Sequence, residues 1–527
     1  MRFDDRFLRE LPGDPETAAR PRQVRGACWS RVEPTKVREP RLIAWSHEVA
    51  EMLGLTAVQM ESAEMTEVLA GNRLLPGMKP YAACYGGHQF GNWAGQLGDG
   101  RAITLGELVD THGEHLELQL KGAGLTAYSR TADGRAVMRS SVREFLCSEA
   151  MHHLGIPTTR ALSLVSTGES VVRDMLYDGN ARPEPGAIVC RVAPTFLRFG
   201  NFEIFASRDE IDVLRALADH TLRTHFPELV NKDPRDGYIA MLAEIATRTA
   251  KLVTHWMRVG FVHGVMNTDN MSVLGLTIDY GPYGWLEGFD PNWTPNTTDA
   301  HRRRYRYGQQ PAIAGWNVAR LASALVPLVD DTASLERALS FYPATLRHEE
   351  PLMWAQKLGL TKLDLENQTG PDAHFLSELF ELFDAHETDM TLFFRRLARV
   401  PSEPGDMSDT SLVAFIDEAF YGAPSSDHSK RMALWLHRYA ARLCEEHIPD
   451  EERRSRMNAV NPKYVLRNYL AQLAIDDAER GDGGKVRELL DVLRHPYDEQ
   501  PNREEYAAKR PEWARHRAGC SMLSCSS

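Results

Sequence analysis

Four polar residues near the middle of the chain have the types and spacing needed for phosphoryl-group chemistry. The stretch HGVMNTDNMSVLGLTIDYGP, residues 263–282, contains His263, Asp269, Asn270 and Asp279. Carboxylate and amide oxygens are the ligands that Mg²⁺ or Mn²⁺ prefers beside phosphate and water, and the last three residues supply them. We therefore expect a divalent metal site here, and we expect His263 to fix the loop rather than to move protons.

One position in this stretch lacks the side chain that a kinase-type loop needs. The pattern H-G-D-x-x-x-x-N places an aspartate two residues after the histidine, where it orients the attacking hydroxyl. That position holds Val265, which cannot accept a proton, while Asp269 stands four positions further on. The carboxylate has thus moved along the loop. This favours attack on a different phosphorus, or on the same phosphorus from another side.

The other parts of a kinase-type site precede this stretch in the expected order. GDGRA, residues 98–102, is a glycine-rich segment, Lys121 ends the segment LQLK, and Glu144 follows 23 residues later. Two structural alternatives stay open. GDGRA on its own is more typical of an ordinary turn. Ser141 to Glu144 fits the capping box S-x-x-E, which would give Glu144 a structural role instead of an ion pair with Lys121.

Hydrophobic periodicity predicts the elements that must position these residues. HLELQLK alternates apolar and polar residues, which is typical of a half-buried strand, and it pairs with ITLGELV in a hairpin across DTHGE. A helix is expected from about Ser141, strands around ALSLVST and GAIVCRVA, and a short hairpin at VLGLTI. A long helix over 237–259 should stop at Gly260, and a short one should span Ile43 to Leu53.

Composition bounds the class of protein. At 527 residues the chain is long enough for a large bilobal unit, and a β-rich first part followed by a helical second part predicts an α+β architecture with a cleft. A net charge of −12 gives no broad attraction to nucleic acid or to an anionic membrane surface. No run approaches the roughly 18 apolar residues of a membrane span, and the acidic start is not a secretory signal. Seven scattered cysteines indicate neither a disulfide framework nor a zinc site, so we expect a cytoplasmic protein.

Several longer stretches resemble the selenoprotein O family of pseudokinases. They are HGVMNTDN with DYGP, LQLKGAG, SRTADGRAVMRSSVREFLCSEA and GQLGDGRA, and the resemblance runs from about Phe7 to the end. It implies a protein-kinase-like fold that binds ATP in a flipped orientation. It also implies transfer of AMP from ATP to Ser, Thr or Tyr hydroxyls of protein substrates, with release of diphosphate.

The resemblance also implies an organisation of the chain. We expect an N-terminal extension over 1–70, a β-rich kinase-like N-lobe with one key helix over 71–205, and a C-lobe with the catalytic loop over 206–400. A helical extension with a cysteine-containing tail would fill 401–527. We expect a monomer.

The resemblance assigns a role to each candidate residue. Asp269 is the expected base, Asn270 and Asp279 are metal ligands, and Lys121 contacts phosphate while pairing with Glu144. The expected nucleotide contacts are Gly98, Gly100, Arg101, Asp133 and Gly134, with Arg191 and Arg198 holding the phosphates. From the residues alone, two arginines seven positions apart on a predicted loop can clamp polyphosphate through forked donors, although surface ion pairing is the more common role for such residues.

The tail and the donor nucleotide leave further alternatives. Relatives end in Cys or selenocysteine followed by two residues, as in Cys525-Ser526-Ser527, but no cysteine follows DYGP before Cys444, so a tail-to-loop disulfide is in doubt. Cys520 could pair with Cys525, or remain an exposed free thiol. UMP transfer from UTP, a conventional protein kinase and an inactive nucleotide-binding scaffold are the competing functions.

Overall fold

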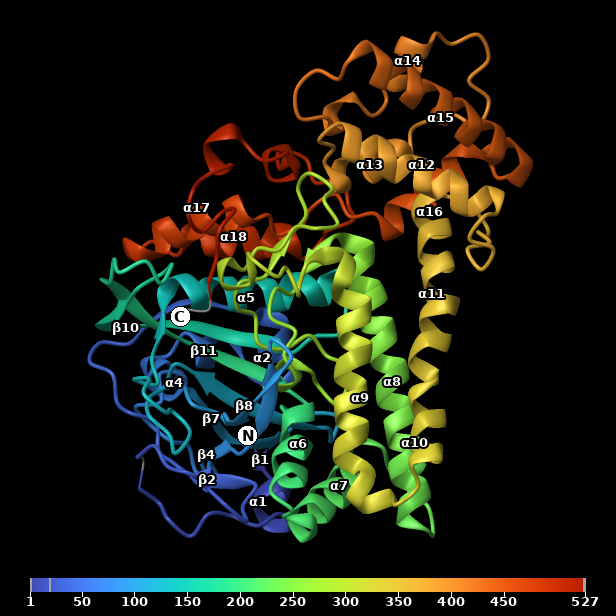
Figure 1. Cartoon of the computed structure of the whole chain (residues 1–527). Helices are drawn as coiled ribbons and strands as arrows, with labels where there is room; N and C mark the ends of the chain where they lie inside the picture. Colours follow the sequence, from blue (N-terminus) through green and yellow to red (C-terminus); the bar gives the residue numbers. More distant parts are fainter. Residues whose placement is uncertain (1, 19, 525–527) are drawn as a thin grey trace.

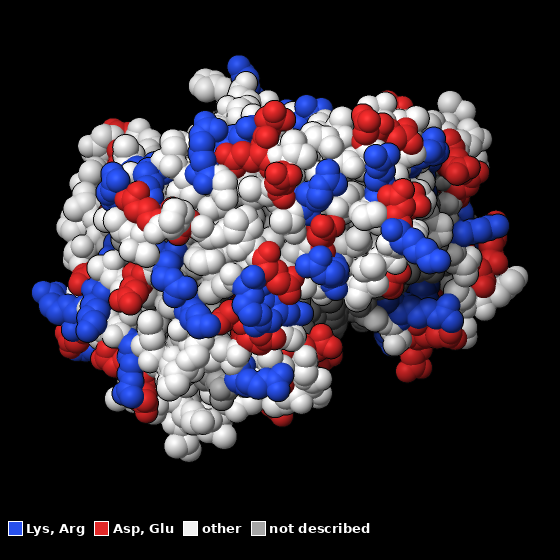
Figure 2. Space-filling view, turned by 90° about the horizontal axis from the view of Figure 1, so that it is seen from below, with Lys and Arg blue, Asp and Glu red and all other residues white. Residues whose placement is uncertain are grey.

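The computed structural model describes residues 2–18 and 20–524, and it divides into a sheet-rich N-terminal part and a helical C-terminal half, as predicted. In Figure 1 the sheet fills one side of the molecule, and three long helices, α8, α9 and α11, stand beside it. A separate group of helices, α12 to α16, lies at the far end of α11. On the face shown in Figure 2, basic and acidic side chains are interspersed, so no single sign of charge dominates that face.

A nine-stranded sheet forms the centre of the N-terminal part, with the order β2-β4-β7-β8-β11-β10-β3 and with β1 and β9 attached to β7 and β11. The strands are β1 Arg2–Phe3, β2 Trp29–Arg31, β3 Arg41–Trp45, β4 Tyr81–Ala83, β7 Ala102–Val109, β8 His115–Lys121, β9 Ala136–Val137, β10 Arg160–Arg173 and β11 Arg182–Ala193. The predicted hairpin of β7 and β8 is present, as are the strands predicted around ALSLVST and GAIVCRVA.

Strand β8 differs from the prediction in its burial. The alternation of apolar and polar residues indicated a half-buried strand, yet its residues from Leu116 to Lys121 are all buried. The polar side chains Glu117, Gln119 and Lys121 lie on one face of the strand because side chains alternate between faces. That face points to other polar groups of the protein and not to solvent, as the site shows below.

Helix α5, Met138–His153, packs on the sheet strands β10 and β11 and is covered by the C-terminal helices α17 and α18 (Figure 1). Thirteen of its 16 residues are buried, which a helix between two layers requires. The helix begins at Met138, with Val137 as its N-cap, so the predicted start at about Ser141 was three residues late. Ser141 is therefore inside the helix and cannot cap it.

The N-terminal segment is also more extended than predicted. Ile43 to Trp45 belong to strand β3, and only α2, His47–Met52, is helical in the region expected to be one helix from Ile43 to Leu53. Ser46 separates the two elements and caps α2 by accepting a hydrogen bond from the Val49 amide. The other helices of this part are α1 Arg6–Glu10, α3 Ala57–Met60 and α4 Ala63–Leu69.

A two-stranded hairpin, separate from the main sheet, contains the glycine-rich segment GGHQFGNWAGQ. Its strands are β5 Gly86–Gln89 and β6 Asn92–Gln96. Strand β5 packs against α6 and against the single helical turn Thr268–Asn270 of the predicted catalytic loop. The hairpin therefore covers that loop from the side of the N-terminal part.

The helical half begins with α6 Phe199–Ser207, α7 Ile211–His225 and α8 Pro234–Val259. Helix α8 ends at Gly260, which has a left-handed φ of +74°, as its position after the last periodic residue predicted. Strand β12, Phe261–Val262, follows directly and pairs with β13, Gly284–Trp285. These two short strands hold the two ends of the predicted catalytic segment together.

Helix α9, Gln310–Val329, packs against α6 and α8. Among the described residues, 307–329 is the one helical segment that could cross a membrane by length and composition, which the sequence prediction did not single out. Its most apolar window is 56% buried inside the protein. It is a core helix in this fold, and composition alone does not distinguish the two cases.

The remaining helices form two groups. A second hydrophobic core lies among α11 to α16, and the helices are α10 Thr332–Leu339, α11 Phe341–Leu358, α12 Pro371–Ala385, α13 Met390–Leu397, α14 Asp409–Val413, α15 Ser426–Glu446 and α16 Asp450–Val460. Helices α17 Asn468–Glu479 and α18 Gly484–Leu493 return to the first core, where they cover α5. The C-terminal extension thus braces the helix that carries Glu144.

Candidate active site

The two arginines expected to hold phosphate are buried, and both contact Asp279. Strand β11 carries Arg191, and Arg198 is the residue that precedes α6, so the predicted loop applies only to the second. Arg191 Nη1 donates to Asp279 Oδ1 at 2.5 Å, and Arg198 Nη1 donates to Asp279 Oδ2. Two guanidinium groups from different elements therefore hold one carboxylate in place.

Glu144 joins this cluster to the end of β8. Its Oε2 accepts a hydrogen bond from Lys121 Nζ, and its Oε1 accepts one from Arg191 Nη1 at 2.9 Å. Lys121 Nζ also lies 4.0 Å from Asp279 Oδ1. Glu144 lies inside α5, and both of its carboxylate oxygens are bound by cationic side chains. The alternative role of Glu144 in a capping box is therefore wrong. We call Lys121, Glu144, Arg191, Arg198 and Asp279 the buried ion-pair cluster.

Charge and backbone geometry at Asp279 fit a metal ligand. Burial on its own would raise the pKa of Asp279, but Arg198, Arg191 and Lys121 hold it well below the usual range. The residue is therefore a carboxylate at neutral pH. Its backbone is left-handed, with φ of +56°, a conformation that is uncommon for residues other than glycine and that recurs at functional sites.

His263 fixes the catalytic loop through both ring nitrogens. Its Nε2 donates to the Ile278 carbonyl at 3.0 Å, and its Nδ1 accepts from the Val265 amide at 3.3 Å. This pattern requires the neutral ring, and burial lowers the pKa of His263. The side chain thus connects the two arms of the segment, as a residue that pins the loop must.

Asp269 lies in the helical turn of the loop and faces the β5–β6 hairpin. An ideal Cβ added to Gly87 would lie 2.7 Å from Asp269 Oδ1, and Gln89 Nε2 is 3.4 Å from Asp269 Oδ2. The Oδ1 atom is buried and has no hydrogen-bond partner among the described residues. Burial raises the pKa of Asp269 to about 7, so the side chain can take up and release a proton near neutral pH.

Asn270 follows Asp269 and presents an amide oxygen. Its Nδ2 donates to the Val265 carbonyl at 2.9 Å, which fixes the amide and leaves the oxygen as the group available to a ligand. Val265 itself is buried, to about the same degree as Asp269.

The glycines of GDGRA are required by packing as well as by any nucleotide. Gly98 has φ of +70°, and an added Cβ would lie 2.3 Å from the Tyr128 ring. A Cβ on Gly100 would lie 2.9 Å from the Tyr128 carbonyl oxygen. The Arg101 carbonyl accepts from the Gly122 amide at 2.7 Å, which brings this turn beside the end of β8 and Lys121. The turn and the buried ion-pair cluster are therefore neighbours.

Asp133 and Gly134 belong to a different surface of the same region. Asp133 Oδ1 accepts from Arg173 Nη2 at 2.7 Å, and its side chain is 46% exposed. The Gly134 carbonyl accepts from the Gly124 amide at 3.0 Å. The described contacts of Asp133 are with Arg173 of β10 and with the Arg135 amide, and they do not include the buried ion-pair cluster.

Gln119, Tyr85 and Gln89 are site residues that the sequence analysis missed. Gln119 Oε1 accepts from Arg191 Nη2, and the Arg198 guanidinium lies 4.5 Å from the centre of the Tyr85 ring. Gln119 lies two residues before Lys121 and therefore on the same face of β8. That spacing is the signal that could have identified it.

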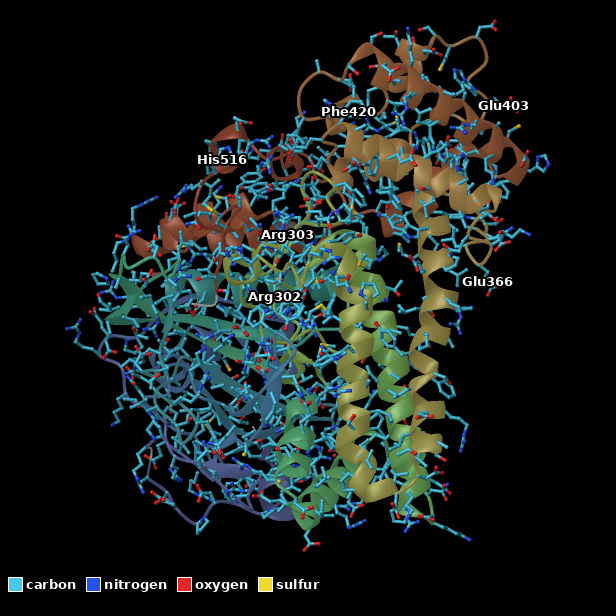
Figure 3. The ribbon with its side chains drawn as sticks, in the orientation of Figure 1. Arg302, Arg303, Glu366, Glu403, Phe420 and His516 are labelled. Carbon is cyan, nitrogen blue, oxygen red and sulfur yellow. The ribbon has the colours of Figure 1, made fainter. Side chains whose placement is uncertain are left out.

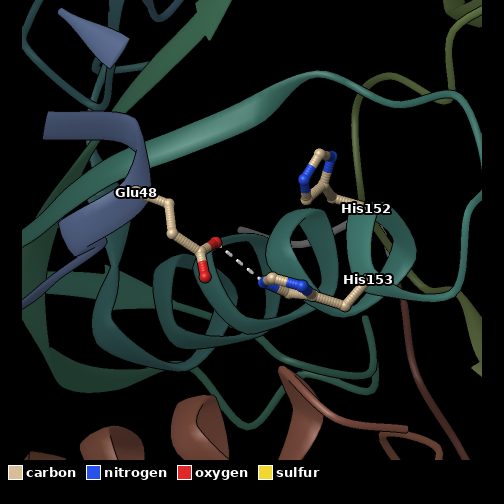
Figure 4. Close-up of side chains that lie close together, drawn as sticks. All are labelled: Glu48, His152 and His153. Atoms are coloured by element: carbon tan, nitrogen blue, oxygen red, sulfur yellow. Dashed lines mark ion pairs between the residues drawn. The ribbon is translucent and has the colours of Figure 1, made fainter. Parts of the chain in front are cut away.

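A second group of possible metal ligands lies at the C-terminal end of α5, away from Asp279. Glu48, His152 and His153 bring ligand-type atoms within 4.8 Å of one another, and Figure 4 shows His153 directed at Glu48. Arg160 Nη2 and Arg494 Nε lie 3.4 Å and 3.7 Å from the Glu48 carboxylate. The Glu48 carboxylate thus takes part in a polar network that joins α2 to α5, to the start of β10 and to the residue after α18, and we assign no metal to it.

The C-terminal tail contacts the segment that follows the catalytic loop. Leu523 forms a parallel bridge with Asn296: its amide donates to the Pro295 carbonyl at 3.0 Å, and its carbonyl accepts from the Thr297 amide at 2.8 Å. Asn296 Nδ2 in turn donates to the Gly264 carbonyl at 3.0 Å. The tail is therefore linked to the catalytic loop through one residue.

Cys520 differs from the expectation of an exposed thiol. Cys520 is free and buried, and burial raises its pKa to about 11. A low thiolate fraction at neutral pH follows, which makes it a weak nucleophile. Cys525 lies outside the described residues.

Comparisons with known proteins agree with one another. A family described as "Protein adenylyltransferase SelO" matches residues 18–494. Three similar relatives are each named "Protein nucleotidyltransferase YdiU": one from Nitrosospira multiformis is 59% identical, one from Rhodopirellula baltica is 58% identical, and one from Azoarcus sp. is 59% identical. All three match 100% of this chain, which covers 96%, 99% and 99% of their respective lengths.

A solved structure with some likeness is described as "ROP2 from Toxoplasma gondii: A virulence factor with a protein-kinase fold and no enzymatic activity". It is 13% identical, and the match covers 57% of this chain and 86% of that one, with a TM-score of 0.23.

Proposed function

The chain belongs to the SelO family and is a protein nucleotidyltransferase, and on that premise we propose that it transfers AMP from ATP to Ser, Thr or Tyr hydroxyls of other proteins. Diphosphate is the second product. The observation that carries this proposal is the position of Asp269. The loop keeps its pinning histidine, its amide and its following aspartate, and only the carboxylate that would act as base has moved from Val265 to Asp269.

In the proposed reaction the hydroxyl oxygen of the acceptor attacks the α-phosphorus of ATP. A bond forms between that oxygen and the α-phosphorus, and the bond from the α-phosphorus to the bridging oxygen of diphosphate breaks. Asp269 takes the hydroxyl proton, which its pKa of about 7 allows near neutral pH. Its partnerless Oδ1 is the atom on which that proton would be accepted.

Arg191, Arg198 and Lys121 are suited to the negative charge of the triphosphate. Both arginines are buried, and their forked donors match phosphate oxygens as well as carboxylates. Because Asp279 and Glu144 already orient them, little reorganisation is needed when phosphate arrives. The expected contacts of Gly98, Gly100, Arg101, Asp133 and Gly134 with the nucleotide are part of the same proposal.

Asn270 and Asp279 fit a hard divalent cation, and we propose Mg²⁺ or Mn²⁺. An amide oxygen and a carboxylate kept ionised by its neighbours are the donor types that such ions take beside phosphate. When bound, the ion would neutralise charge on the phosphates and on the departing diphosphate. The same proposal has the protein act as a monomer in the cytoplasm, which sedimentation analysis and cell fractionation would test.

Labelled nucleotides distinguish the possible reactions. With ATP labelled at the α-phosphate, Mg²⁺ or Mn²⁺ and an acceptor protein, we expect label in protein, and intact-mass analysis should show a gain of one AMP. Incorporation of γ-label alone would contradict the proposal and support a conventional kinase. No incorporation from either label would support an inactive scaffold. A parallel reaction with α-labelled UTP separates AMP transfer from UMP transfer.

A further inference from the structure

A stretch of 30 residues after the catalytic segment, 300–329, carries five arginines and no carboxylate. The whole chain has 73 acidic and 61 basic residues and is negatively charged, whereas this stretch is positively charged. The arginines are Arg302, Arg303, Arg304, Arg306 and Arg320, and we call them the open arginine cluster.

None of these five arginines forms an ion pair with a carboxylate in the part of the chain that the structure describes. The nearest acidic residue in the sequence, Asp299, is used for another purpose. Its Oδ1 accepts from the Arg304 amide at 3.0 Å, and its Oδ2 accepts from the Tyr305 amide at 2.7 Å. Asp299 thus fixes the backbone of the turn, and the guanidinium charges remain available to a ligand.

The turn that carries the cluster is attached to the catalytic loop and to the hairpin above it. The Tyr305 hydroxyl donates to Asn267 Oδ1 at 2.6 Å and accepts from the Phe90 amide at 2.9 Å. An ideal Cβ on Gly91 would lie 3.3 Å from Arg304 Cζ. Since Gly91 is two residues from Gln89, which lies 3.4 Å from Asp269, the cluster and Asp269 contact the same hairpin.

Two of the arginines are held in place by an aromatic ring. The guanidinium carbons of Arg304 and Arg320 lie 4.9 Å and 5.1 Å from the centre of the Trp316 ring, on α9. Such cation–π contacts orient a guanidinium without neutralising its charge. Arg302 and Arg303 are exposed, and Figure 3 shows them at the front of the molecule, over the region between the sheet and α9.

We propose that the open arginine cluster binds acidic residues that flank the acceptor hydroxyl, so that this enzyme modifies sites in Asp- and Glu-rich segments. This proposal rests on the proposed function and names the class of its protein substrate. Arg304 and Asp269 contact the hairpin at positions two residues apart, a separation that about three to four residues of extended peptide, at about 3.3–3.6 Å each, can span. The carboxylates that matter are therefore those about three to four positions from the modified residue.

Two other polyanions fit the cluster less well. The nucleotide phosphates already have Lys121, Arg191 and Arg198, which are buried next to Asp279. Nucleic acid binding draws on many phosphate contacts spread over a basic surface, whereas this chain has a net charge of −12 and one short basic turn. An acidic peptide needs only a few guanidinium groups beside the acceptor residue.

The test compares acceptor peptides of equal length that differ only in flanking charge. One peptide has Glu three and four residues from a central Tyr, and the second has Gln at both positions. With the full chain, Mg²⁺ and α-labelled ATP, we expect kcat/KM to be roughly tenfold higher for the Glu peptide, mostly through KM. Equal values for the two peptides would overturn the proposal.

Charge reversal in the protein supplies the second arm. Arg302→Glu with Arg303→Glu, both exposed, should remove the preference for the Glu peptide, while Arg347→Glu, the same change on the exposed face of α11, should preserve it. Equal loss of activity toward both peptides in the double variant would contradict the proposal. A double variant that loses binding of an oligonucleotide but keeps its preference for the Glu peptide would also contradict the proposal.

A binding measurement separates failure of this inference from failure of the proposed function. Fluorescence anisotropy with labelled Glu and Gln peptides needs no nucleotide and no transfer. If the unaltered chain binds the Glu peptide about tenfold more tightly but transfers no label, the proposed AMP transfer is wrong and the proposed peptide-binding surface is right. If it transfers α-label but binds both peptides equally, the function stands and this inference is wrong.

Discussion

Two groups of arginines, one before and one after the catalytic loop in the sequence, are used in opposite ways. Arg191 and Arg198 are buried, and both bind carboxylates of the protein. The five members of the open arginine cluster are partly or fully exposed, and within the described residues they have no carboxylate partner. The same side chain thus serves as an internal orienting group in one place and as an unfilled binding group in the other.

The free-energy cost of removing a charge from water explains the difference. A buried guanidinium without a partner costs several kcal/mol, so a protein can place one in its interior only by pairing it. An exposed guanidinium is solvated, and its charge can be left free for a ligand at little cost. The buried ion-pair cluster therefore fixes geometry before substrate arrives, whereas the open arginine cluster can select among substrates. The predictions below test this division.

Removing Asp279 should have the largest effect, because both Arg191 and Arg198 lose a partner in the interior. We expect Asp279→Ala to abolish label transfer and to lower the free energy of unfolding by about 3–5 kcal/mol. Urea denaturation measures the second quantity. The matched control is Glu452→Ala, which removes an exposed pair with Arg456 and should cost less than about 1 kcal/mol. Similar losses in the two variants would contradict the distinction between buried and open charges.

Asp269→Asn should separate chemistry from binding. We expect transfer to fall by about 10²–10⁴-fold while ATP affinity stays within about threefold, because the amide cannot accept the hydroxyl proton. Full activity of this variant would show that Asp269 is not the base.

Asp269→Asn should not lower the free energy of unfolding, and the pKa of Asp269 gives the direction of the expected change. The folded-state pKa of Asp269, about 7, lies above the value of about 3.9 expected in the unfolded chain. Ionisation therefore favours the unfolded state as pH rises from about 4 to 7. In EDTA we expect the free energy of unfolding of the variant to match that of the parent below pH 4. At pH 8 we expect it to be higher than that of the parent by on the order of 1–4 kcal/mol. A variant less stable than the parent at pH 8 would contradict this.

The role of the β5–β6 hairpin, which contacts both Asp269 and Arg304, can be tested through Gly87. The added methyl group of Gly87→Ala would lie 2.7 Å from Asp269 Oδ1 and must displace either the hairpin or the carboxylate. We expect transfer to fall by about 10–100-fold, since small displacements of a catalytic group have effects of this size. Ala94→Ser, an exposed change on the same hairpin, should leave the rate unchanged. If both variants were fully active, the hairpin would not determine the position of Asp269.

Salt should have the smallest effect, and it should act on only one of the clusters. Between 50 and 300 mM NaCl we expect KM for the Glu peptide to rise about three- to fivefold, because exposed charges are screened over a few ångströms at high salt. KM for the Gln peptide should change by less than about twofold. Parallel changes for both peptides would indicate that the open arginine cluster does not contact the acceptor.

Local patterns predicted many elements correctly. The end of α8 at Gly260 and the β7–β8 hairpin follow from periodicity and turn residues, and the family resemblance is confirmed by the match over residues 18–494. The polar face of β8 was misjudged because alternation cannot tell solvent from a buried polar cluster. The start of α5 was placed late because Ser141 to Glu144 has the pattern of a cap although Glu144 pairs with Lys121.

The candidate site was less predictable than the elements. The ion pairs from Asp279 to Arg191 and Arg198 join residues 81 to 88 positions apart, and no local pattern indicates such contacts. Asp133 was predicted to contact the nucleotide, which stays a prediction, and its hydrogen bond to Arg173, 40 residues away, is likewise not indicated by any local pattern. The sequence contains the open arginine cluster as a run of basic residues. Only the structure shows that the neighbouring Asp299 accepts hydrogen bonds from backbone amides and does not pair with these arginines.

The bridge between Leu523 and Asn296 also sets an order of events during synthesis. A ribosome delivers residue 523 last among the bridge's partners, more than 220 residues after the segment that it contacts. Asn296, which donates to the Gly264 carbonyl, can therefore gain this neighbour only after the residues between them have been synthesised. A chain truncated before residue 523 would keep every member of the buried ion-pair cluster and still lack the strand partner that borders its catalytic loop.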